Sequence, residues 1–86
     1  MSIYTAKVTF MELRASLGTY EPLQSCCLAI GVSNALIDYM EFYAISQEEL
    51  HRFSSVGGYE ELKKLVKNCR DGKEEGRFIK PSQSVN

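Results

Sequence analysis

Three cysteines and a single histidine are the residues of this chain with the most recognisable chemistry. Cys26 and Cys27 are adjacent, and adjacent residues of a strand point to opposite faces of a sheet, so their thiolates would not chelate one ion. Zinc sites favour cysteines that are separated by two to four residues, and the sequence has no such pair. We therefore predict no metal site and no cofactor, and we expect both cysteines to lie in the core.

The remaining candidates for catalysis are Cys69 and His51. Cys69 falls on the apolar stripe of an expected helix, which indicates a core position, and His51 follows Leu50 at what we expect to be the rim of another helix. Gly57-Gly58 lacks the surrounding residues of a phosphate-binding loop. We predict no catalytic residue and a protein that is not an enzyme, with a small cysteine enzyme as the least favoured alternative.

The size and charge of the chain limit its partners. A chain of 86 residues forms one domain with a modest core, and its formal net charge of −1 gives no general attraction for nucleic acid or an anionic membrane. Residues 1–58 carry three basic and six acidic side chains, whereas residues 59–86 carry seven basic and five acidic ones. Any contact with a polyanion is therefore expected in the last third.

The distribution of apolar residues predicts a soluble, cytoplasmic protein. The longest uncharged run, 22–37, contains several polar residues and is shorter than the roughly 18 apolar residues of a membrane span. The first ten residues lack the pattern of a secretory signal, and an odd number of cysteines fits a reducing compartment. We expect residues 1–80 to form a single compact domain and residues 81–86 to form a flexible tail.

The N-terminal part predicts a strand followed by a short helix. Alternation of apolar and polar residues from Ile3 to Val8 is typical of a half-buried strand. Thr9 to Glu12 matches a capping box, the next apolar residues share a helical face, and Gly18 stands where a glycine often ends a helix. Continuation of the strand is the alternative.

Residues 23–45 fit two incompatible structures. From Cys26 to Ser33 larger and smaller side chains alternate, which suits a strand with one thick and one thin face, but the apolar residues from Leu23 to Ile30 also have helical spacing. Aromatic and β-branched residues in 36–45 favour a strand. We predict a β-hairpin at about 26–45, with a helix-turn-helix at about 23–45 as the alternative.

Clearer patterns follow. A capping box at Ser46–Glu49 predicts a helix over about 47–54, and an apolar stripe predicts a second helix over about 59–70. A short edge strand is expected at 77–80. The predicted fold class is a small single α+β domain, and an all-α domain is the alternative.

The segment around Gly31-Val32-Ser33 resembles the helix-turn-helix of phage and bacterial repressors, with small Cys27 four residues before the turn glycine. This resemblance implies a DNA-binding transcriptional regulator. The second helix would carry Asn34, Asp38 and Glu41 with no lysine or arginine, and such a face would repel phosphates. DNA binding is therefore the alternative function rather than the favoured one.

The hairpin interpretation is similar to the N-terminal module of Phd/YefM-type antitoxins. The similarity rests on Glu12-Leu13-Arg14 and on Ile45-Ser46 followed by Glu48-Glu49-Leu50. In that family the module dimerises on operator DNA and a C-terminal segment masks a toxin. The basic hairpin turn of the family is replaced here by Ser33-Asn34-Ala35, which again argues against contact with DNA.

Tyrosines are numerous for so small a core, and tyrosine is enriched at protein interfaces. We predict a partner-binding surface from an apolar and acidic patch on strand 36–45 and from the lysines outside the apolar stripe of helix 59–70: Tyr39, Glu41, Tyr43, Lys63, Lys64 and Lys67. The expected function is a non-enzymatic protein-binding module, a small inhibitor, antitoxin-like or adaptor protein that occludes or scaffolds a protein partner. A homodimer is a further expectation, as is a phage or mobile-element source, by analogy of size.

Overall fold

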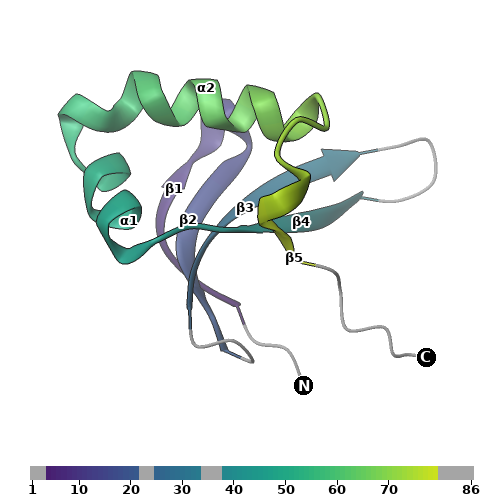
Figure 1. The fold of residues 1–86 in the computed structure, drawn as a ribbon, viewed down its shortest axis with the longest axis horizontal. Helices are drawn as coiled ribbons and strands as arrows, with labels where there is room; N and C mark the ends of the chain where they lie inside the picture. The colour runs from purple at the N-terminus through teal and green to yellow at the C-terminus, as the bar shows by residue number, and fades with distance from the viewer. Residues whose placement is uncertain (1–3, 22–24, 34–37, 80–86) are drawn as a thin grey trace.

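The computed structural model describes residues 4–21, 25–33 and 38–79, which form one antiparallel sheet and two α-helices. The strands follow one another in the sheet in the order of the chain: β1 (Tyr4–Phe10), β2 (Ala15–Tyr20), β3 (Ser25–Ser33), β4 (Asp38–Ala44) and β5 (Phe78–Ile79). Figure 1 shows α1 (Gln47–Ser54) and α2 (Tyr59–Arg70) over one face of the sheet. The α+β fold class is thus confirmed. No helix in the described ranges is long and apolar enough to cross a membrane.

The predicted hairpin is confirmed, and the helix-turn-helix is wrong. β3 and β4 pair from Cys27 opposite Ala44 to Ser33 opposite Asp38. The alternation of large and small side chains along β3 decides the outcome, because only a strand places all the large ones on one face. The connection at residues 34–37 lies outside the described residues.

The short helix predicted after the first strand is also wrong. β1 continues to Phe10, a 3₁₀ turn covers Met11–Leu13, and Arg14 closes the turn in the left-handed region with φ 53°. Leu17 then pairs with Leu28 in the sheet, and both side chains are fully buried. Burial of apolar side chains in the paired strands outweighs the local capping pattern. The alternative prediction, in which the first strand continues, is therefore the correct one, and that strand extends to Phe10.

The predictions for the second half of the chain are confirmed. Both helices have the predicted bounds, and α1 begins with the expected capping box, in which Glu49 N donates to Ser46 Oγ at 3.0 Å and Ser46 N donates to Glu49 Oε1 at 2.9 Å. The predicted edge strand at 77–80 corresponds to β5. Residue 80 and the predicted tail at 81–86 lie outside the described residues.

The main core lies between the sheet and the helices. Strands β2, β3 and β4 contribute one face of alternating apolar residues, and α2 contributes the stripe that its sequence predicts. The buried members of this core are Ala15, Leu17, Cys26, Leu28, Ile30, Tyr43, Ile45, Phe53, Leu62, Leu65, Val66 and Cys69.

The opposite face of the sheet holds a second, smaller apolar cluster. Small residues occupy its middle, and Cys27 and Ala29 there are fully buried. The ring of Phe42 lies 5.1 Å from that of Tyr20 and 5.2 Å from that of Tyr4, measured between centroids. Because Tyr4 belongs to β1 and Phe42 to β4, the sheet must curl until side chains of its first and fourth strands meet over the small residues.

A substitution at Gly18 tests the close packing of β2 against β1. A Cβ atom at Gly18 would overlap the carbonyl oxygen of Thr5 in β1, whereas a Cβ at Gly57 would have no neighbour within 4 Å. We expect Gly18→Ala to lower the free energy of unfolding by about 1–3 kcal/mol, the usual cost of overpacking. Urea denaturation measures the change, and Gly57→Ala is the matched control, expected within about 0.5 kcal/mol of the parent protein. Equal stability of the two variants would contradict the packing described for β1 and β2.

Candidate functional site

Only part of the outer edge of β4 is paired among the described residues. β5 pairs only with Phe42 and Tyr43, so from Asp38 to Glu41 the strand has no neighbour on its outer side among the residues that the structure describes. We name this segment, Asp38–Glu41, the open edge. A row of unpaired backbone N–H and C=O groups of this kind can pair with a strand from another chain.

Two large apolar side chains flank the open edge. Tyr39 is 40% exposed and Met40 is 45% exposed. They point to opposite faces because they are adjacent in a strand: Tyr39 shares the face of Tyr43, which packs under α2, and Met40 lies opposite Gly31 on the other face. A strand added at this edge would therefore find an exposed apolar side chain on each face.

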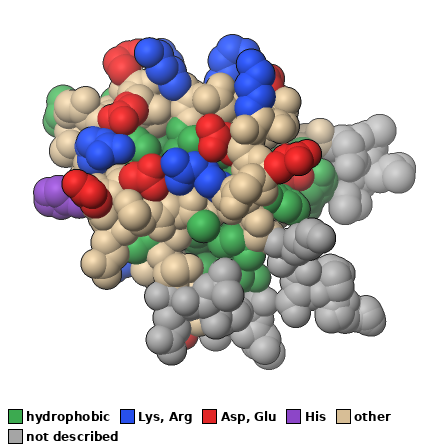
Figure 2. Space-filling view, in the orientation of Figure 1, with side chains coloured by type: hydrophobic (Ala, Val, Ile, Leu, Met, Phe, Trp, Pro, Cys, Tyr) green, Lys and Arg blue, Asp and Glu red, His purple; other side chains and the backbone are tan. Residues whose placement is uncertain are grey.

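A hollow of about 290 Å³ lies at the end of the open edge. Its lining comes from β4, from the end of α2 and from the segment that leads to β5: Glu41, Tyr43, Cys69, Arg70, Gly72, Glu74, Glu75 and Phe78. Three carboxylates and one guanidinium line it, so it is named the acidic hollow here. Figure 2 shows an acidic side chain beside hydrophobic ones on the right of the view, where Figure 1 places the end of α2 and β4.

Tyr43 forms the inner wall of the acidic hollow. Its side chain is 5% exposed, and its hydroxyl donates to Glu41 Oε1 at 2.9 Å and lies 3.4 Å from the Cys69 carbonyl oxygen. Burial raises the pKa of Tyr43, and its hydrogen bond to Glu41 raises that pKa further. The phenol thus stays protonated at neutral pH and holds the Glu41 carboxylate in place.

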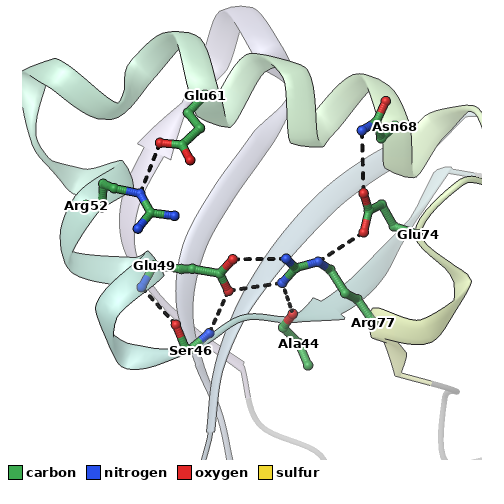
Figure 3. A network of polar contacts seen from close by, with 8 residues as sticks. All are labelled: Ala44, Ser46, Glu49, Arg52, Glu61, Asn68, Glu74 and Arg77. Atoms are coloured by element: carbon green, nitrogen blue, oxygen red, sulfur yellow. Dashed lines mark hydrogen bonds and ion pairs between the residues drawn. The ribbon is translucent and has the colours of Figure 1, made fainter.

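Arg77 holds in place the segment that forms the outer wall of the acidic hollow (Figure 3). Its guanidinium donates to both carboxylate oxygens of Glu49 at 3.0 and 2.9 Å, to Glu74 at 3.0 Å and to the Ala44 carbonyl oxygen at 3.1 Å. These contacts tie the segment after α2 to the first turn of α1 and to the end of β4. They hold β5 against β4 and place Glu74 at the hollow.

Arg70 occupies the rim of the hollow, but its donors are directed elsewhere. Its Nη1 donates to the carbonyl oxygen of Gly31 and its Nη2 to that of Leu13, both at 2.9 Å. The side chain thereby joins the end of α2 to the end of the sheet. Glu74 is already paired with Arg77 at 3.0 Å, so Glu41 and Glu75 are the two lining carboxylates that stand against the single guanidinium of Arg70. The lining therefore stays net negative.

The structure brings together only part of the predicted partner-binding surface. Tyr39 and Glu41 lie on the open edge as the alternation predicts, but Tyr43 is buried beneath α2 and contributes only to the inner wall of the acidic hollow. Lys63, Lys64 and Lys67 are exposed on the outer side of α2, opposite its buried stripe.

These lysines form a separate surface of mixed charge. Lys63 lies 3.8 Å from Glu60, and Lys67 lies 3.0 Å from Asp71. Acidic and basic side chains are interspersed over the helices in Figure 2. Such a surface offers no extended positive field for a polyanion.

Four residues of the site are not among those predicted from the sequence: Met40, Glu74, Glu75 and Phe78. The period of two along β4 places Met40 on the face opposite Tyr39, so the predicted strand already implies the position of Met40. Nothing local indicates the other three, because they reach the site only when the segment after α2 packs back against β4, through the pairing of β5 and the ion pair of Arg77 with Glu49.

The cysteines behave as core residues, as predicted. All three are free and buried. Burial raises the pKa of Cys27 to about 11 and that of Cys69 to about 12, so both remain thiols at neutral pH and are poor nucleophiles. His51 is exposed, as expected for a rim position. Within residues 4–21, 25–33 and 38–79 no group of three or more His, Cys, Asp or Glu side chains could hold a metal ion.

No protein-family model, no curated protein and no solved structure matches this chain. The open edge and the acidic hollow are the features of the molecule from which we infer a function.

Glu49→Gln tests the Arg77 network. The hydrogen bonds from Arg77 lower the pKa of Glu49 below its usual 4.5, so the ionised carboxylate stabilises the folded state above that pH. We expect Glu49→Gln to lower the free energy of unfolding by about 1–2 kcal/mol at pH 7. The difference from the parent protein should shrink as the pH falls below 4.5 through the lowered pKa. Urea denaturation across pH measures it, and a difference independent of pH would contradict the ion pair.

The burial of the thiols predicts their reactivity. In the native protein Cys26, Cys27 and Cys69 should react with a thiol reagent at neutral pH far more slowly than a free cysteine, because each is buried. In urea all three should react at the ordinary rate. Mass spectrometry after alkylation counts the modified residues, and rapid labelling of native Cys69 would reopen the case for a cysteine enzyme.

Proposed function

We propose that this protein is a non-enzymatic binding module that holds a protein partner at the open edge of β4. The observation that carries the proposal is a strand edge that has no neighbour among residues 4–21, 25–33 and 38–79 and is flanked by the exposed side chains of Tyr39 and Met40. An added strand gains affinity from backbone hydrogen bonds and specificity from the side chains on alternate faces. The module would act by covering an extended segment of its partner, as an inhibitor or an adaptor.

The remaining surface gives less support to other functions. The thiols of Cys27 and Cys69 have raised pKa values, whereas a catalytic cysteine needs a lowered one. The lysines of α2 alternate with carboxylates, whereas nucleic-acid binding needs a basic surface. These two observations favour a protein partner over a substrate or a polyanion.

Site-specific photo-crosslinking tests the proposal. A photoreactive amino acid replaces Met40 on the open edge or, as the matched control, Val56, which is 97% exposed in the connection between α1 and α2. After irradiation in cells of the natural source, we expect a discrete protein adduct from position 40 and none from position 56. Gel electrophoresis and mass spectrometry after nuclease treatment identify the adduct.

The outcomes separate the alternatives. Adducts from position 56 alone, or equal labelling from both positions, would contradict binding at the open edge. An adduct that disappears on nuclease treatment would point to nucleic acid. An adduct of twice the mass of the chain would identify the partner as a second copy.

A further inference from the structure

We infer that the segment bound at the open edge is an extended strand of a different protein and that it places a lysine or arginine side chain in the acidic hollow. The inference rests on the proposed function and specifies the chemistry of the partner. Three features carry it: the direction of Glu41, the lining of the hollow, and the charge of the open edge itself.

Glu41 connects the open edge to the hollow. It is the last residue of β4 before the positions that pair with β5, and its side chain lines the hollow. The residue opposite Glu41 on an added strand would project from the same face, with Cβ atoms about 4.5–5.5 Å apart. A cationic residue there would face the Glu41 carboxylate directly, and its longer side chain would extend into the hollow.

The lining of the hollow suits a long cationic side chain. Glu75 approaches from the segment before β5 and adds a second carboxylate to that of Glu41, beside Glu74, which is paired with Arg77. Phe78 is 36% exposed, and its ring lies 5.4 Å from that of Tyr43, so an apolar wall is available for the methylene stem of lysine or arginine. Arg70 at the rim keeps its positive charge, and its two Nη groups donate to the backbone carbonyls of Gly31 and Leu13.

Charge also disfavours a second copy as the occupant of this edge. Asp38 and Glu41 are the two ends of the four-residue open edge, so pairing two open edges would gather four carboxylates in one short ladder. Like charges on paired strands destabilise the pairing. A partner strand that carries positive charge has the opposite effect.

The alternation of the strand sets a sequence pattern for the partner. The position next to the basic residue would face Met40 on the other side of the sheet, where an apolar side chain can cover the exposed thioether. The expected motif is therefore a basic residue adjacent to an apolar one, within a segment free of proline.

Short peptides provide the probe. They share an alternating threonine and valine background and differ only at one central residue, which is lysine, norleucine or glutamate. Amide resonances of the isotope-labelled protein report binding and its place. We expect the lysine peptide to shift resonances of Asp38–Glu41 and Glu74–Glu75, the norleucine peptide to bind about tenfold more weakly, and the glutamate peptide not to bind.

Charge variants assign the effect to the hollow. Glu41→Gln still accepts the Tyr43 hydroxyl bond and Glu75 is exposed, so Glu41→Gln and Glu75→Gln should both fold. Each should weaken the lysine peptide several-fold and leave the norleucine peptide unchanged. Glu60→Gln on the outer side of α2 is the matched control and should change neither.

Equal affinity for the lysine and glutamate peptides would overturn the inference, and so would resonance shifts away from the open edge. Absence of binding by every peptide would overturn it as well. The crosslinking experiment separates failure of this inference from failure of the proposed function. An adduct at position 40 whose bound segment lacks a basic residue rejects this inference and keeps the proposed function, whereas an adduct at position 56 alone rejects the proposed function.

Discussion

The small side chains on one face of β2 and β3 are the constraint on which the rest of the structure depends. At Gly18 the neighbouring strand β1 approaches so closely that a methyl group would not fit. Cys27 and Ala29 leave room above the sheet for the aromatic rings of its outer strands. The sheet can therefore curl and bury residues on both faces, which gives a short chain more apolar burial than a single-faced sheet would.

Patterns that depend on near neighbours predicted most of this fold. The capping box at Ser46–Glu49 and the stripe of 59–70 are local, and both helices have the expected bounds. The similar capping pattern at Thr9–Glu12 failed because Leu17 is buried more completely beside Leu28 than a short isolated helix would allow. The choice between hairpin and helix-turn-helix was equally a matter of tertiary burial, which periodicity alone does not contain.

The candidate site was predictable only where it lies within one strand. Tyr39 and Glu41 follow from the period of two along β4, but the same period could not reveal that α2 covers Tyr43. The acidic hollow combines β4, the end of α2 and the segment before β5, and Arg77 assembles them through contacts with Glu49 and Ala44. A site built from three separate segments leaves no spacing in the sequence from which it could be inferred.

The strand order has a consequence for the sequence of events in folding. Strands β1 to β4 each pair with the next strand along the chain, so each pairing closes only a short loop. β5 pairs with β4 only after both helices intervene, and this contact has a much higher loop-closure cost. We expect the four-stranded meander to form early and the Arg77 segment to dock last. The proposed partner surface would then be completed late, so a partner that needs the acidic hollow would bind only fully folded molecules.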